Sequence, residues 1–303
     1  MHDAAVRYAR LRGKGVSWSL RYCPHVGYMP PDQMLFRLLG GRDRPSQVTF
    51  AAREGFAGIL YPWAADSSPE ERGAVARQLS EFKLACSCIV TVPLTKLLQP
   101  LWVSDSSESR QSLVDHVVNA ITVARELGST ILAAILISDG QTSEAVQRRR
   151  AIEALRMIAD LTARHGIMVG VEPMVAIPNS LLQSFAAGAE LVRACNHPAV
   201  KLILDTGHLV DMRETVVQTF REAYDDICLL QLADMPGRVE PGQGEIDFVQ
   251  LLAHAIHRGY SGLVDLEHDW RSHDQNAEQA GIDNLAMLDS KARAEALRLA
   301  RAD

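Results

Sequence analysis

The sequence predicts an α/β fold, a single (β/α)8 barrel over residues 1–303, and three observations carry this prediction. Short β-rich runs alternate with longer segments of helical periodicity, the pattern of a parallel sheet covered by helices. The length fits one such barrel, which typically has about 250 residues. Four runs in the second half end at Glu172, Asp205, Gln231 and Glu267, spaced 33, 26 and 36 residues apart. These intervals are close to the strand-plus-helix unit of roughly 30 residues.

Eight runs of mostly β-branched and aliphatic residues are predicted as the barrel strands. They span residues 16–23, 57–61, 84–92, 130–138, 167–172, 201–205, 227–231 and 263–267. Residues 1–15 are expected to form a flexible or peripheral N-terminal segment outside the barrel.

The connections between these runs are predicted as crossover helices. Apolar residues recur at helical spacing from Leu113 to Leu127, and Gly128 is expected to end that helix. A later helix is expected to begin after the N-cap residue Asp247. The least regular stretches, 30–46 and 93–108, are expected to be long loops at the catalytic rim or lids.

Composition and charge narrow the classes of function. The formal net charge is −6 and the isoelectric point is near 5.9, which argues against a nucleic-acid partner because such binding needs clustered basic residues. No apolar run is long enough for a membrane span, and none has the form of a secretory signal. The five cysteines are scattered and odd in number, which favours reduced core thiols. We therefore expect a cytoplasmic protein.

Side-chain alternation predicts which residues point into the barrel. Successive strand residues face opposite sides, so Glu172 shares its face with Gly170 and Met168, and Glu267 shares its face with Asp265. In the same way Asp205 shares its face with Ile203 and Gln231 with Leu229, whereas the flanking Val171, Leu204, Leu230 and Leu266 are expected to face the helices. In a barrel of this kind the active site lies at the carboxyl ends of the strands. The four terminal oxygen-bearing side chains are therefore expected on one inner rim. Asp265, one layer deeper, is expected to be a structural group, hydrogen-bonded or ion-paired, rather than a metal ligand.

Three sequence segments resemble the xylose-isomerase-like TIM-barrel superfamily. They are the Asp-Thr-Gly-His sequence at 205–208, the Gln-Leu-Ala-Asp-Met-Pro-Gly-Arg-Val-Glu-Pro-Gly-Gln-Gly sequence at 231–244, and the Tyr-Ser-Gly-Leu-Val-Asp-Leu-Glu sequence at 260–267. Within that superfamily the motifs are most similar to those of hydroxypyruvate isomerases.

The resemblance implies a metal site and a reaction type. It places one divalent ion on Glu172, Asp205, Gln231 and Glu267, and hard oxygen ligands suit Mn²⁺ or Mg²⁺. It also gives Glu172 and Glu267 a second role as catalytic acid and base in an enediolate path. The function implied is isomerisation or epimerisation of a small ketose, oxo-acid or sugar derivative.

Four residues are expected to contact this substrate. The resemblance assigns His208 and Arg238 to substrate binding, and His25 and Trp63 are added because they follow the first two predicted strands. However, Glu172-Pro173 is followed by Met174 and further apolar residues where hydroxypyruvate isomerases have polar ones.

That apolar stretch leaves a second function open. A metal-dependent lyase on the same scaffold, such as a dehydratase, a decarboxylase or a C-glycoside-cleaving subunit, fits an apolar wall better. A barrel that binds a partner without catalysis would be expected to lack one of the four ligands. The sequence also leaves open whether the chain acts alone, as a homo-oligomer or with a partner subunit.

Overall fold

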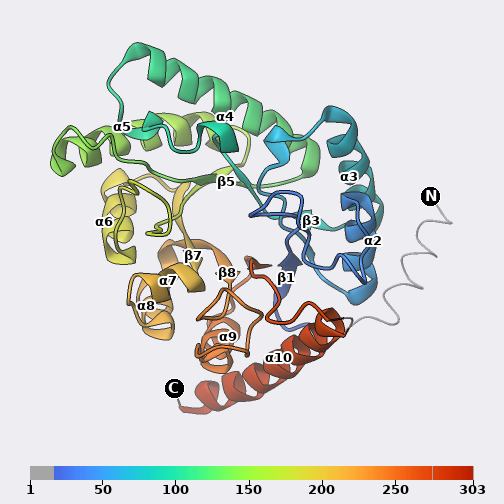
Figure 1. The fold of residues 1–303 in the computed structure, drawn as a ribbon. Helices are drawn as coiled ribbons and strands as arrows, with labels where there is room; N and C mark the ends of the chain where they lie inside the picture. The colour runs from blue at the N-terminus through green and yellow to red at the C-terminus, as the bar shows by residue number, and fades with distance from the viewer. Residues whose placement is uncertain (1–16, 275, 303) are drawn as a thin grey trace.

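A computed structural model describes residues 17–274 and 276–302 of the chain. The segment 1–15, expected to be peripheral, lies outside the described residues, so this expectation and the assignment of 1–303 to one domain stay predictions. In the described part, strands stand at the centre and helices surround them (Figure 1).

Each predicted strand corresponds to a strand or strand pair of the structure. The strands are β1 (Arg21–Pro24), β2 (Gly58–Ile59), β3 (Ala85–Cys86), β4 (Cys88–Val90), β5 (Ile131–Ala134), β6 (Met168–Val171), β7 (Val200–Asp205), β8 (Ile227–Leu232) and β9 (Leu263–Leu266). β3 and β4 are two halves of the single strand predicted over 84–92, interrupted at Ser87.

The helices alternate with these strands along the chain. They are α2 (Arg44–Glu54), α3 (Pro69–Phe82), α4 (Ser107–Leu127), α5 (Glu144–Ala163), α6 (Phe185–Cys195), α7 (Thr206–Asp211), α8 (Val216–Ala223), α9 (Phe248–His257) and α10 (Ala277–Ala302). The predicted helix end at Gly128 is confirmed, because that residue caps α4 with φ of 73°. Asp247 caps α9 as predicted, accepting a hydrogen bond from the backbone N–H of Gln250.

Parallel pairing closes the strands into a barrel. Seven strands form one sheet in the order β1-β9-β8-β7-β6-β5-β4, so the first strand lies beside the last. The remaining pair, β2 and β3, joins this sheet through backbone bonds: the N–H of Leu60 donates to Pro24 O, and the N–H of Val26 donates to Leu60 O. The predicted (β/α)8 barrel is confirmed.

The two expected loops are shorter and more ordered than predicted. The 30–46 prediction was wrong at its end, because α2 begins at Arg44 with Asp43 as a side-chain cap and Pro45 in its first turn. The 93–108 prediction also ran into a helix, since α4 starts at Ser107. Within this stretch Leu101–Val103 forms a buried 3-10 turn. Burial of three consecutive large apolar residues fixes this segment against the core, which is unlike a mobile lid.

The buried apolar side chains separate into two clusters, as the alternation predicted. Val171, Leu204 and Leu266 belong to the larger cluster, which joins the strands to the surrounding helices. Ile203 and Leu229 belong to a smaller cluster inside the barrel. The inner face of each strand therefore leads up to the site residues at its carboxyl end.

All five cysteines are free, as expected, and four of them are buried. Among the described residues, no helix combines the length and apolar character needed to cross a membrane.

Candidate active site

The four predicted metal ligands lie at the carboxyl ends of neighbouring strands. Glu172 directly follows β6, Asp205 ends β7, Gln231 lies near the end of β8 and Glu267 directly follows β9. Asp205 and Gln231 are register partners across β7 and β8. Glu172, Asp205 and Gln231 are 7%, 3% and 2% exposed. The strand order therefore brings together residues that are far apart in the sequence.

Glu172, Asp205 and His208 form one cluster of ligand atoms. One atom from each lies within 4.8 Å of the others. Asp205 caps α7, and its Oδ1 accepts a hydrogen bond of 2.8 Å from the backbone N–H of His208. The cap places the imidazole in the first turn of α7, where Nε2 lies 3.7 Å from Glu172 Oε1. This group of side chains could hold a metal ion.

Gln231 and Glu267 form a second pair on the adjoining strands. Nε2 of Gln231 donates to Glu267 Oε2 at 2.6 Å. Its Oε1 is buried and has no hydrogen-bond partner among the described residues. An unpaired buried carboxamide oxygen is costly unless something else binds it. Metal ligation would satisfy this atom.

Arg238 lies between the two groups and ties them together. Its guanidinium donates to both carboxylate oxygens of Asp205, at 3.1 and 2.9 Å, and to the backbone carbonyl of Glu267 at 3.0 Å. This forked geometry is specific to arginine. Gly207 leaves room for it, because a Cβ there would meet Arg238 Nη1 at 2.8 Å. Arg238 is thus an internal counterion of the site, a role that the sequence did not predict.

The loop that carries Arg238 is organised by Asp234. This fully buried carboxylate accepts four backbone N–H groups, from Met235, Gly242, Gly244 and Ile246, at 2.8–3.0 Å. Gly244 is required for this close approach, because a Cβ there would meet Asp234 Oδ1 at 2.4 Å. The many glycines and prolines of the motif therefore form a loop wrapped around one side chain.

Tyr28 is a site residue that sequence reasoning did not assign. It lies in the loop after β1, and the Arg238 guanidinium carbon is 5.8 Å from the centre of its ring. Its neighbour Arg238 lies in another loop, more than 200 residues later, so no local pattern could have predicted the contact.

His25 and Trp63 lie beside this region with their polar atoms already engaged. His25 Nε2 donates to His268 O at 3.0 Å, and its Nδ1 accepts from the N–H of Gly27 at 3.2 Å. The Trp63 indole N–H donates to Tyr28 O. Trp63 packs in the interior cluster with Met174. Substrate contact by either residue stays a prediction, and for Trp63 it would involve the ring face.

Burial governs the charges of the site. Burial, with the neighbouring Asp205 charge, raises the pKa of Glu172 to about 8, and burial raises the pKa of Glu267 well above its ordinary range. Burial alone would also raise the pKa of Asp205, but Arg238 and His208 together hold it below its ordinary value. Burial lowers the pKa of His208. Groups with opposite shifts in one site suit acid and base roles.

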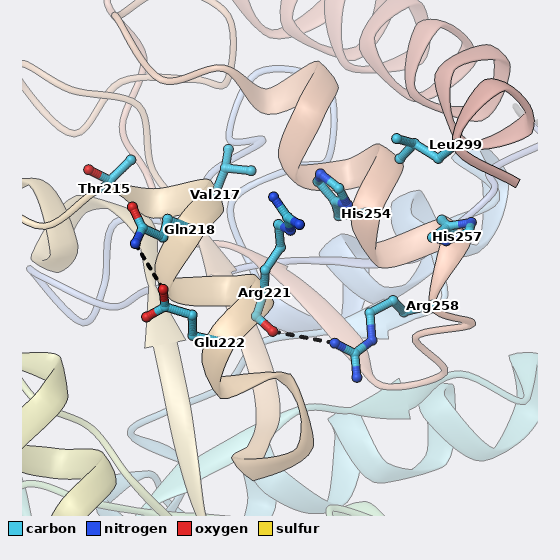
Figure 2. A pocket seen from close by; sticks show the side chains of 9 residues that line it. All are labelled: Thr215, Val217, Gln218, Arg221, Glu222, His254, His257, Arg258 and Leu299. Atoms are coloured by element: carbon cyan, nitrogen blue, oxygen red, sulfur yellow. Dashed lines mark hydrogen bonds between the residues drawn. The ribbon is translucent and has the colours of Figure 1, made fainter. Parts of the chain in front are cut away.

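A separate cavity of about 880 Å³ lies on the outside of the barrel (Figure 2). Its walls come from α8, α9 and α10, and they include Arg221, His254 and Arg258. The side chain of Arg258 donates to the backbone carbonyl of Arg221 at 3.3 Å. The cavity is lined by residues of the outer helical layer, and none of the proposed site residues is among them.

Comparison with curated proteins finds relatives that act as isomerases and as a dehydratase. The chain is 28% identical over 227 residues to a 2-oxo-tetronate isomerase of Pectobacterium atrosepticum, covering 73% of this chain and 84% of the relative. It is 28% identical over 172 residues to the hydroxypyruvate isomerase of Escherichia coli, covering 55% and 65%. It is 25% identical over 169 residues to a 3-dehydroshikimate dehydratase of Pseudomonas putida, covering 52% and 26%.

A family model described as xylose isomerase-like TIM barrel matches residues 48–291. This span includes all four predicted metal ligands, His208 and Arg238. The matched relatives confirm the prediction of an enzyme of the isomerase and epimerase kind. The family predicted from the motifs is confirmed as well: the chain belongs to the xylose isomerase-like TIM barrel family.

Proposed function

We propose that this protein is a divalent-metal-dependent isomerase or epimerase of a small ketose, oxo-acid or sugar derivative. The observation that carries the proposal is the convergence of three carboxylates and one carboxamide at the ends of β6 to β9, where Gln231 Oε1 is buried and has no hydrogen-bond partner in the part of the chain that the structure describes. Such a set offers hard oxygen atoms on one rim. The similarity to 2-oxo-tetronate and hydroxypyruvate isomerases supports the same class of substrate.

The residues present fit one Mn²⁺ or Mg²⁺ ion held by Glu172, Asp205, Gln231 and Glu267. The hydrogen bonds from Arg238 leave part of the Asp205 carboxylate available, since a carboxylate offers about four lone-pair sites. Among the described residues, Oδ1 accepts from His208 and Arg238, whereas Oδ2 accepts from Arg238 alone. One site on Oδ2 therefore remains for an ion. When bound, the ion would act as a Lewis acid on the substrate's carbonyl and adjacent hydroxyl oxygens.

Glu172 and Glu267 are proposed to move the carbon-bound proton. No described residue donates a hydrogen bond to the Glu172 carboxylate, since even His208 Nε2 lies 3.7 Å from its Oε1, so its oxygens are available to accept a proton. Glu267 is oriented by Gln231. One glutamate would remove the proton to give an enediolate, and the other would return it to the opposite face or to the neighbouring carbon. The substrate and the direction of reaction decide which glutamate acts first.

Arg238 and His208 are proposed to hold the substrate's oxygens. Nε of Arg238 and Nδ1 of His208 are both buried without a hydrogen-bond partner among the described residues. Both residues already contact a proposed metal ligand. A substrate bound at the ion would therefore lie next to them.

A lyase is the second candidate, and the buried Met174 favours it. Met174 follows Glu172 by two positions and packs with Trp63 inside the barrel, which gives the site an apolar side. The same proton removal by a glutamate would then lead to loss of water, carbon dioxide or an aglycone. The cytoplasmic location, and any assembly with further copies or a partner subunit, also stay predictions.

Turnover in deuterated water tests the proposed reaction and separates the two candidates. The purified protein, loaded with Mn²⁺, would be offered small ketoses and oxo-acids, and the products would be analysed by mass spectrometry and NMR. An isomerase or epimerase incorporates deuterium next to the carbonyl and otherwise conserves mass. A product that has lost water, carbon dioxide or an aglycone would assign the lyase function instead.

Variants Glu172→Gln and Glu267→Gln provide the control. Both are expected to keep the fold and to abolish exchange, because an amide cannot accept the proton. Full activity after exhaustive chelation would refute the metal requirement. Activity that survives in Glu267→Gln, with no deuterium uptake by any active substrate, would refute the proton transfer.

A further inference from the structure

We infer that Asp265 is a positioning residue that fixes the orientation of the Gln231 carboxamide and thereby presents its oxygen to the metal ion. The inference rests on the proposed metal function. Asp265 lies in β9, is completely buried and faces the barrel interior one layer below Glu267. It is the register partner of Gln231 across β8 and β9.

The orientation of a carboxamide needs an external cause. The nitrogen and oxygen of Gln231 are nearly equal in size, so packing alone barely distinguishes the two flipped states. In the structure, Nε2 donates to Glu267 Oε2 at 2.6 Å and lies 3.5 Å from Asp265 Oδ2. A flipped side chain would turn its oxygen toward these two acceptors. The two carboxyl groups together therefore disfavour the flip.

Asp265 is itself held from across the barrel. Ser87, between β3 and β4, donates its hydroxyl to Asp265 Oδ2 at 2.8 Å. The two residues are 178 positions apart. Ser87 is 1% exposed, so this hydrogen bond lies inside the protein. The bond keeps Oδ2 on the side where Gln231 Nε2 needs an acceptor.

The result of this arrangement is the unpaired Gln231 Oε1. With both N–H groups of the amide turned toward carboxyl oxygens, Oε1 must point the other way, and it is buried without a hydrogen-bond partner in the described structure. Partners that orient a metal ligand typically contribute about 10- to 100-fold in metal affinity. Asp265 has the geometry of such a partner.

The test measures Mn²⁺ affinity, independently of turnover, by titration calorimetry and by the electron paramagnetic resonance signal of free Mn²⁺. Asp265→Asn is expected to weaken binding about 10- to 100-fold, because an asparagine amide can donate to Gln231 Oε1 and stabilise the flipped state. Asp289→Asn is the matched control. Asp289 is also buried and hydrogen-bonded, to Tyr22 and Ser19, and belongs to the outer helix α10. This variant should bind Mn²⁺ as wild type does.

A second pair of variants separates orientation from general damage. A glutamate at position 231 offers an oxygen in either flipped state, so it needs no orienting partner. In the Gln231→Glu background, Asp265→Asn is therefore expected to leave Mn²⁺ affinity unchanged or to raise it. If Asp265→Asn weakens Mn²⁺ binding equally in both backgrounds, the inference is overturned, because the effect would then not depend on the orientation of the carboxamide.

The remaining outcomes are distinguishable. If wild type itself binds no Mn²⁺, the proposed function fails, and the inference fails with it. If wild type binds and Asp265→Asn binds within twofold, only the inference fails. Should Asp265→Asn not fold, Ser87→Ala keeps the carboxyl group and removes its tether. It is expected to weaken binding by a smaller factor, and unchanged affinity there would count against the inference.

Discussion

Removing the Asp234 carboxylate should destabilise the protein and displace Arg238. This side chain accepts four backbone N–H groups in a fully buried setting. A hydrogen bond to a charged group contributes about 1.5–3 kcal/mol, so four bonds could contribute about 6–12 kcal/mol. The loop can relax and admit water, so we expect Asp234→Ala to lose about half of this, roughly 3–6 kcal/mol. That is a large part of a typical stability of about 5–15 kcal/mol.

Asp234→Asn gives a graded comparison. Asparagine keeps one acceptor oxygen but places its NH2 group against two of the backbone N–H groups. The unfolding free energy of Asp234→Asn should therefore lie between those of wild type and Asp234→Ala. Urea unfolding followed by circular dichroism measures both losses, and kcat/KM should fall along with stability because Arg238 is carried by this loop. A loss below about 1 kcal/mol in Asp234→Ala, with unchanged kcat/KM, would refute the role of this carboxylate.

Three further outcomes are expected. Arg238→Lys should lower kcat/KM with little change in melting temperature, since an ammonium cannot contact both Asp205 oxygens in the forked geometry; a destabilised but fully active variant would make Arg238 a structural strut. Gly207→Ala should lower kcat/KM and, unlike Arg238→Lys, also lower the unfolding free energy by about 3–5 kcal/mol, because its methyl group would displace the Arg238 guanidinium and leave the buried Asp205 carboxylate without its counterion. With a chelator present, the unfolding free energy of Asp265→Asn should rise relative to that of wild type as the pH is raised from about 4 to 8. The reason is that burial raises the pKa of Asp265 from 3.8 to about 8, and a raised carboxyl pKa stabilises at low pH and loses that contribution as pH rises. A pH-independent difference between the two proteins would contradict this assignment.

The sequence predicted the barrel and its inner rim because both follow from local periodicity. Alternation along each strand correctly assigned Ile203 and Leu229 to the interior and Leu204 to the helical side. The interruption at Ser87 was not predicted. At this point the chain changes its pairing partner, because β3 pairs with β2 and β4 pairs with β5. Such a change depends on strands that are distant in the sequence and has no local signal.

The site was predictable in its residues and less so in its contacts. Strand-end positions and motifs identified Glu172, Asp205, Gln231 and Glu267, which the structure places at the carboxyl ends of neighbouring strands. The forked contact of Arg238 with Asp205 depends on how the 234–246 loop folds back, and that is decided by the buried Asp234. A sequence pattern identifies such a loop but does not specify which residues its side chains contact.

The pairing of β1 with β9 has a consequence for the order in which the protein matures. During synthesis, β1 emerges before the other strands, and its partner Leu263–Leu266 leaves the ribosome about 240 residues later. At roughly 5–20 residues per second, this delay is about 10–50 seconds. Until then the growing sheet has open edges at β1 and at its newest strand, which are surfaces for mispairing with other chains. Glu267 arrives with the same strand that closes the ring. A nascent chain therefore cannot assemble the complete proposed ligand set before closure, and an ion bound afterwards would stabilise the closed state over every open one.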